Sequence, residues 1–114
     1  MRAINLALTT IVASLALAAP SFGATHVNTT LTGTVGPGFT ITMNKKTVKA
    51  GTYVLTIRDR SAIHNFHLTG PGVNKKTSVP AVGTTTWKLK LKKGTYKFVC
   101  DPHATIMHGV LKVT

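Results

Sequence analysis

Residues 98–110 read FVCDPHATIMHGV, and this stretch decides how the rest of the chain is interpreted. It holds the only cysteine, Cys100, followed by His103, Met107 and His108. A thiolate, an imidazole and a thioether at Cys-x2-His-x3-Met spacing suit a copper ion, because copper sites with one Cys and two His use a weak, long axial Met. One histidine is missing from this set, and the remaining sequence has to supply it.

The length of 114 residues predicts a single domain. The chain opens with Met1-Arg2, an apolar stretch over 3–19 and small residues up to Gly23, which predicts a secretory signal peptide over residues 1–23 and a mature domain over 24–114. The alternative is an uncleaved anchor, for which an interrupted run of about 17 apolar residues is marginal. In an exported protein, a single cysteine pairs with another chain, stays a free thiol or binds a metal.

The charge of the chain is strongly positive. Fourteen Lys and Arg face two acids, for a formal charge of +12, and the domain without Arg2 would carry +11. Such a charge suggests nucleic acid, an anionic membrane surface or an acidic protein as partner, and export argues against nucleic acid. With Asp59 and Asp101 as the only carboxylates, general acid–base catalysis has few candidates, so we expect no enzyme.

After residue 25 the sequence consists of short β-rich runs separated by Gly, Pro and Asn. Seven or eight strands with turn signals every 8–12 residues predict an all-β sandwich or barrel. Alternation over residues 39–43 places Phe39, Ile41 and Met43 on one face of the expected strand. Residues 73–82 are polar and are expected to be irregular. The expected strands are 26–35, 39–43, 47–49, 52–59, 63–69, 84–91, 95–100 and 110–114.

The expected strand 63–69 offers two candidates for the missing histidine. Side chains alternate along a strand, so His64, Phe66 and Leu68 share one face and His67 points to the other. Only one of the two histidines can join the metal without distortion. His64 is favoured, because apolar residues follow it on the same face.

Together these features resemble the cupredoxins, the small blue-copper proteins such as plastocyanin, amicyanin and pseudoazurin. The similarity rests on His64-Asn65 after an extended run, on residues 96–103 with Cys100 and His103, and on Met107-x-Gly109 before the last strand. It implies a Greek-key β-sandwich of about seven to eight strands. It also implies one mononuclear type 1 copper ion and electron transfer between Cu(I) and Cu(II).

The resemblance also implies a role for each site residue. By position, His64, Cys100 and His103 would be the equatorial ligands and Met107 the axial one, with His108 as an alternative axial ligand. Asn65 resembles the residue whose amide ties the first histidine segment to the cysteine loop. Such outer contacts matter about 10–100-fold in metal affinity or activity.

The function implied is a monomeric electron carrier, periplasmic or secreted, with no stable membrane insertion after cleavage. Its redox partner would present an acidic surface, and the association rate would fall with salt. An apolar rim around His103 is expected from Gly36, Pro37, Pro71, Pro102, Ala104 and Ile106.

Two other functions stay open at this point. Copper storage or delivery draws support from the additional donors His26, His67 and His108. A metal-free basic sandwich that binds an anionic surface would explain the lysines, but it leaves the cysteine motif without a role.

Overall fold

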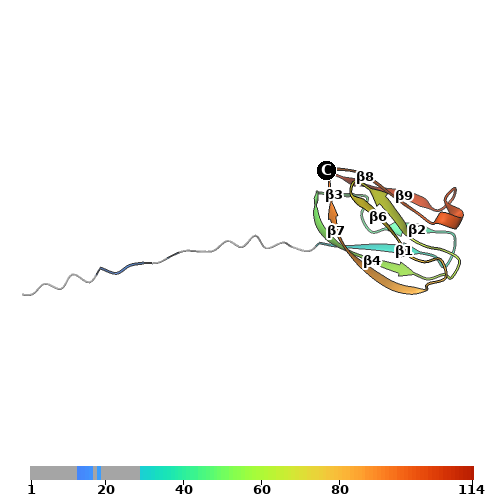
Figure 1. The fold of residues 1–114 in the computed structure, drawn as a ribbon, viewed down its shortest axis with the longest axis horizontal. Coiled ribbons are helices and arrows are strands. Elements are labelled where there is room, and N and C mark those ends of the chain that lie inside the picture. The colour runs from blue at the N-terminus through green and yellow to red at the C-terminus, as the bar shows by residue number, and fades with distance from the viewer. Residues whose placement is uncertain (1–12, 17, 19–28) are drawn as a thin grey trace, which may run out of the picture.

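The computed structural model describes residues 13–16, 18 and 29–114 (Figure 1). The predicted cleavage site after Gly23 lies outside these residues, as does most of the predicted signal segment. Within the described residues, no helix is both long enough and apolar enough to cross a membrane.

Two β-sheets face each other across the core. The first has the strand order β2-β1-β4-β7, in which β1 and β4 run parallel and the other neighbours antiparallel. Its strands are β1 (Thr29–Val35), β2 (Ile41–Met43), β4 (Gly51–Asp59) and β7 (Gly83–Leu91).

The second sheet has the order β3-β9-β8-β5-β6, with β3 parallel to β9. Its strands are β3 (Thr47–Val48), β5 (His67–Gly70), β6 (Val73–Lys76), β8 (Gly94–Val99) and β9 (His108–Val113), and one 3₁₀ turn, η1 (Asp101–His103), lies between the last two. The mixed, all-β sandwich confirms the predicted fold class.

Alternating apolar residues of both sheets form the core, as the period of a half-buried strand requires. Phe66 stacks on Phe98 with ring centroids 5.7 Å apart and planes 6° apart, and it meets the Trp87 ring edge-on. The other fully buried side chains include Leu31, Leu55, Ile57, Leu68, Tyr96 and Leu111.

The strand directions bring four loops to one end of the sandwich. β1 and β4 end there at Val35 and Asp59, β8 ends there at Val99, and β5 begins there at His67. We call this the site end; its loops are 36–40, 60–66, 77–82 and 100–107. β1 begins at the opposite end, at Thr29, where the turn between β7 and β8 also lies (Figure 1).

Three details differ from the sequence-based expectation. Residues 63–66 are not a strand, because they cross from the first sheet to the second, and β5 begins only at His67. Residues 73–76, expected to be irregular, form β6 and bring the number of strands within the described residues to nine. Phe39 precedes β2 and is 56% exposed, so it does not share the buried face of Ile41.

Candidate metal centre

Three predicted ligands meet at the site end. His64, Cys100 and His103 come from two loops distant in sequence, yet their donor atoms all lie within 4.8 Å of one another. His64 and Cys100 are fully buried, and His103 is half-buried. The structure therefore brings together the residues that the sequence singled out, and it leaves His67 outside the cluster.

The three donor atoms are close enough to share one ion. His64 Nδ1 is 3.1 Å from His103 Nδ1, and Cys100 Sγ is 3.7 Å and 3.6 Å from these two nitrogens. Ligand atoms bound to one ion at about 2.0 Å for nitrogen and 2.3 Å for sulfur lie roughly 3–4 Å apart. Two imidazoles and a thiolate in this arrangement are a donor set that suits copper.

The cysteine loop is closed by its own backbone. Cys100 follows β8, and its N–H donates to the Met107 carbonyl at 3.0 Å. The His103 carbonyl accepts from Met107 N at 2.8 Å and from Ile106 N at 3.0 Å. Pro102 lies in the first turn of η1, where a missing N–H costs nothing. These bonds fix Cys100 and His103 at the separation that a shared ion needs.

His64 is positioned by the crossover between the sheets. Asp59 Oδ1 accepts a hydrogen bond from Ser61 N at 3.0 Å, and His64 N donates to the Ser61 carbonyl at 3.4 Å. Burial raises the pKa of Asp59, although this hydrogen bond and the nearby His64 oppose the rise. The turn delivers His64 into the space between the sheets, where Gly36 lies close against its ring.

Asn65 joins the two halves of the centre. Its backbone N–H points at Cys100 Sγ at 3.4 Å. Its side-chain oxygen accepts from Asp101 N at 2.8 Å, and its amide nitrogen donates to Asp101 Oδ2 at 2.8 Å and to the Thr77 carbonyl at 3.2 Å. The predicted tie between the His64 segment and the cysteine loop is confirmed.

Asp101 extends this tie to β5 and β6. Its Oδ1 lies 2.8 Å from His67 Nδ1, and His67 Nε2 lies 2.7 Å from Asn74 Oδ1. Burial alone would raise the pKa of Asp101, but the hydrogen bonds from Asn65 and His67 outweigh it and lower the pKa. For His67, burial is likewise outweighed by Asp101 and Asn74, so its pKa is raised. Both shifts favour a charged pair.

The two candidate axial ligands are in different environments. Met107 is 1% exposed and ends the loop inside the core. His108 begins β9 opposite Val99, is exposed, and lines a surface groove with Ile41 and Phe98. Within residues 29–114, it is not part of any cluster of metal-binding side chains.

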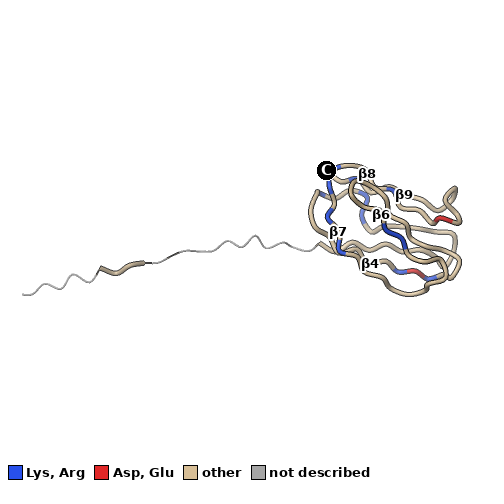
Figure 2. The backbone as a smooth tube through the Cα atoms, in the orientation of Figure 1, with Lys and Arg blue, Asp and Glu red and all other residues tan. Residues whose placement is uncertain are grey.

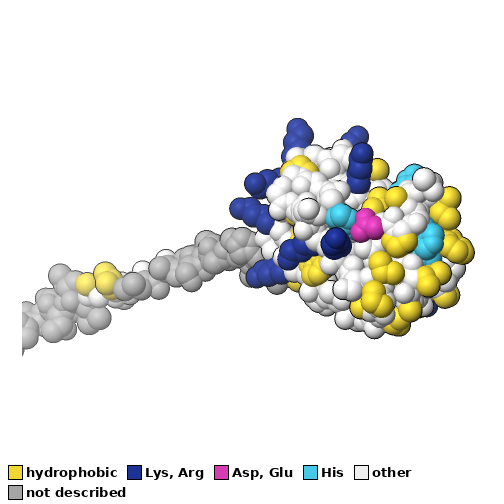
Figure 3. All heavy atoms as spheres, turned by 45° about the vertical axis from the view of Figure 1, so that its right-hand side comes forward, with side chains coloured by type: hydrophobic (Ala, Val, Ile, Leu, Met, Phe, Trp, Pro, Cys, Tyr) yellow, Lys and Arg dark blue, Asp and Glu magenta, His cyan; other side chains and the backbone are white. Residues whose placement is uncertain are grey.

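The surface above His103 is apolar, and its principal aromatic was missed by the sequence reasoning. The Phe39 ring lies edge-on to His64 and His103, with centroids 5.3 Å and 5.0 Å away. The signal in the sequence that could have placed Phe39 at this surface was its position directly after the turn residues Gly36-Pro37-Gly38. Exposed apolar side chains gather around the histidines of this end in Figure 3. They include Pro37, Phe39, Ile63, Pro102, Ala104 and Ile106.

Two members of the predicted rim are wrong. Pro71 lies in the turn between β5 and β6, against Gly94 and beneath the Tyr96 hydroxyl, which donates to its carbonyl at 2.7 Å. That turn is at the opposite end of the sandwich, because β5 runs away from the site. Gly36 is near the site but buried against the His64 ring, so it contributes no exposed rim surface.

Comparison with known proteins adds independent information. A family model described as copper-binding proteins of the plastocyanin/azurin family matches residues 27–114. The chain belongs to this family. The cupredoxin resemblance of the sequence is thereby confirmed, and copper is the cofactor that the family and the donor set share.

Solved cupredoxin structures have the same fold. Reduced rusticyanin superposes with a TM-score of 0.56 at 23% identity, covering 75% of this chain and 78% of that chain. Rusticyanin from Thiobacillus ferrooxidans gives a TM-score of 0.55 at 24% identity, covering 75% and 76%. No curated protein sequence matches the chain significantly.

Proposed function

We propose that this cupredoxin is an exported electron carrier with one type 1 copper ion. His64, Cys100 and His103 would be the equatorial ligands, and Met107 the axial one. The single observation that carries the proposal is the approach of Nδ1, Nδ1 and Sγ to within 3.1–3.7 Å at one end of a β-sandwich. When bound, copper supplies the Cu(I)/Cu(II) couple.

Each side chain has a role that follows from its surroundings. Cys100 is buried, its sulfur receives the Asn65 N–H, and a bound copper ion would deprotonate the coordinating thiol. Met107 offers a soft, weak donor, which raises a copper potential. The hydrogen bonds of the loop and of Asn65 hold the donors nearly still, so little rearrangement accompanies a change of charge.

His103 is the exit for electrons. It is the half-buried ligand, and Phe39 lies against its ring at the surface. An apolar face around a half-buried ligand suits a weak, short-lived complex of the kind that redox proteins form. We propose a monomer whose partner binds this face. The net charge supports a partner with an acidic surface. Protein ligands alone would fill the coordination of the copper ion and leave no position for a substrate, which supports a carrier over an enzyme.

The visible spectrum tests the ligand set. We expect the protein loaded with Cu(II) to absorb strongly in the visible through charge transfer from the Cys100 thiolate. Cys100→Ser should abolish this band while its far-ultraviolet circular dichroism stays that of a β-sandwich. A colourless wild-type protein with an intact, reduced Cys100 would refute the type 1 assignment.

Copper delivery is the competing function; of its additional donors, His26 lies outside the described residues, and the other two have less to offer a second ion. His67 has both ring nitrogens engaged by Asp101 and Asn74, so it is no free donor, and His108 lies away from the cluster. Copper transfer to a chelator measured beside electron self-exchange separates the two functions. Rapid transfer with slow self-exchange would favour delivery, and the reverse would favour electron transfer.

A further inference from the structure

Six of the thirteen Lys and Arg residues between 29 and 114 lie at the end opposite the metal centre. Lys92 and Lys93 form the turn between β7 and β8, Lys90 pairs with Thr52 near the start of β4, and Lys112 pairs with Thr95 near the start of β8. We call this surface the lysine end. Its exposed members are Lys45, Lys49, Lys90, Lys92, Lys93 and Lys112.

The two carboxylates are at the other end. Asp59 closes β4 and Asp101 opens the ligand loop, and both appear at the site end in Figure 2. Within the described residues, none of the six lysines of the lysine end forms a salt bridge. Their charge is therefore not neutralised inside the molecule, and in Figure 3 lysine and arginine side chains fringe the part of the surface away from the apolar site end.

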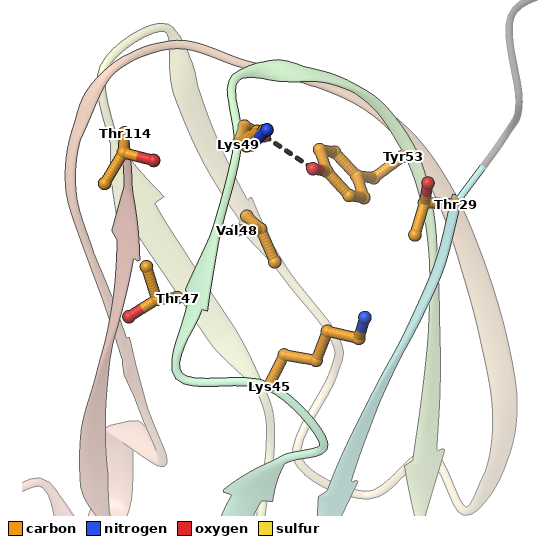
Figure 4. Close-up of a pocket in the computed structure, with 7 residues that line it drawn as sticks. All are labelled: Thr29, Lys45, Thr47, Val48, Lys49, Tyr53 and Thr114. Carbon is orange, nitrogen blue, oxygen red and sulfur yellow. Dashed lines mark hydrogen bonds between the residues drawn. The ribbon is translucent and has the colours of Figure 1, made fainter.

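The lysine end lacks the features of a specific protein interface. Over residues 29–114, the large exposed apolar side chains are Phe39, Ile63, Val82 and Ile106 at the site end and Val110 on β9, and none lies among the six lysines. Protein interfaces have apolar, aromatic-rich centres and are depleted in lysine. Figure 4 shows a hollow at this end lined mostly by threonine and lysine side chains, with Lys45 and Lys49 on its wall.

A charged lipid surface fits these features better. A bilayer of anionic phospholipids attracts basic side chains without an apolar anchor or a fixed geometry. Lysine keeps its flexible stem and its hydration in such a contact. The chain also enters β1 at this end, at Thr29, so a retained N-terminal apolar segment would bring the same end toward a membrane (Figure 1).

We propose that the lysine end binds the surface of anionic phospholipid membranes and thereby directs the site end away from the bilayer. The binding is electrostatic, reversible and independent of copper. Bound in this way, the apolar face with Phe39 and Ile106 stays open to a redox partner.

Vesicle binding tests this proposal on the exported protein as purified. The probes are vesicles of equal parts phosphatidylglycerol and phosphatidylcholine, with pure phosphatidylcholine as the neutral control. We expect binding to the anionic vesicles that persists at physiological salt, weakens as salt is raised further and is lost at high salt, since screening shortens the reach of exposed charges. Equal binding to neutral vesicles would overturn the proposal, because it would indicate that an apolar segment binds the lipid and the lysines do not.

Paired variants test the location of the binding surface. Lys92→Gln combined with Lys93→Gln should weaken binding to anionic vesicles about 30-fold, from roughly 1 kcal/mol for each basic residue near the surface. Arg58→Gln combined with Arg60→Gln removes the same net charge near the site end and should weaken it less than about threefold. Equal losses in the two variants would mean that only net charge acts, and the proposal would fail.

Hydrogen exchange gives the orientation without relying on copper. On anionic vesicles, backbone exchange should slow around residues 91–95 and stay unchanged around 102–106. Protection of 102–106 instead would show that the site end faces the lipid. Failure of any of these tests leaves the copper assignment untouched, because none of them measures the metal.

Discussion

Asp101 is the residue through which the ligand loop is attached to the rest of the second sheet. It follows the metal-binding cysteine, and it is bound from one side by Asn65 and from the other by His67. His67 is in turn held by Asn74 of β6. A histidine outside the metal centre therefore contributes to the position of a loop that carries three of the proposed ligands.

The His67–Asp101 pair gives a stability contribution that depends on pH. The pKa of Asp101 is lowered from 3.8, so its contribution is present above that value and is lost as pH falls through the lowered pKa. The pKa of His67 is raised from 6.5, so its contribution is present below that value and is lost as pH rises through the raised pKa. The pair should therefore stabilise the fold most between these limits.

We predict that His67→Ala lowers the free energy of unfolding by about 1 kcal/mol or less near pH 5.5, the range of a partly exposed ion pair. Near pH 9 the loss should be smaller, because the charged form of His67 is lost as pH rises through its raised pKa. Urea unfolding of the copper-free protein measures both values. His108→Ala, at an exposed position outside this network, serves as the control. A loss that does not depend on pH would contradict the charged pair.

For single residues, the sequence predicts the chemistry of the metal centre better than the position of each side chain. The spacing of Cys100, His103 and Met107 was sufficient to indicate copper, and alternation selected His64 over His67. The structure places His64 with Cys100 and His103 although the reason given for it was incomplete, because His64, Asn65 and Phe66 are all buried in a crossover and do not alternate. Phe39 was missed, since strand propensity does not show where a strand begins.

Among the elements, β8 and β9 transmit their packing directly to the metal centre. Phe98 pairs with Gly109 across these strands, and its ring covers the glycine so closely that an added Cβ would lie 2.3 Å from the ring. Cys100 follows two residues after Phe98, directly past the end of β8. Any displacement of Phe98 is therefore expected to displace Cys100 as well.

We predict that Gly109→Ala destabilises the protein by about 1–3 kcal/mol, the usual cost of overpacking a core. It should also alter the visible band of the Cu(II) protein, because Phe98 must move beside Cys100. Chemical denaturation and the absorption spectrum measure the two effects. Gly38→Ala, with nothing within 4 Å of the added Cβ, is the matched control and should change neither. Equal stability of the two variants would refute this account.

The elements also show where local pattern fails. Polar residues 73–76 gave no strand signal of their own, and β6 exists because it pairs with β5 at the edge of the second sheet. Conversely, residues 63–66 look like a strand but are held by Ser61, Thr77 and Asp101 in a crossover. Both outcomes depend on partners distant in sequence, which a local pattern does not contain.

For the whole molecule, composition gives the charge but not its distribution. A formal charge of +12 was evident from the sequence, whereas the placement of six lysines away from both the apolar face and the two carboxylates follows only from the topology. The strands bring Lys92 and Lys93 to one end and Ile106 to the other. The lysines of that end can therefore bind a charged surface without entering contacts at the metal centre.

This separation predicts how two copies exchange electrons, if the protein is the carrier proposed above. Self-exchange requires the two His103 edges to meet, so the apolar site ends face each other while the lysine ends point outward. Ile106→Lys places like charges in that contact and should slow self-exchange about tenfold or more, since facing like charges cost several kcal/mol. Line broadening in mixtures of Cu(I) and Cu(II) protein measures the rate.

Val110→Lys is the matched control. It adds the same charge at another exposed apolar position, on β9 where Val110 pairs with Lys97 of β8, and it should change the rate of self-exchange little. If the two variants slow exchange equally, net charge governs the encounter and the site end is not the contact surface.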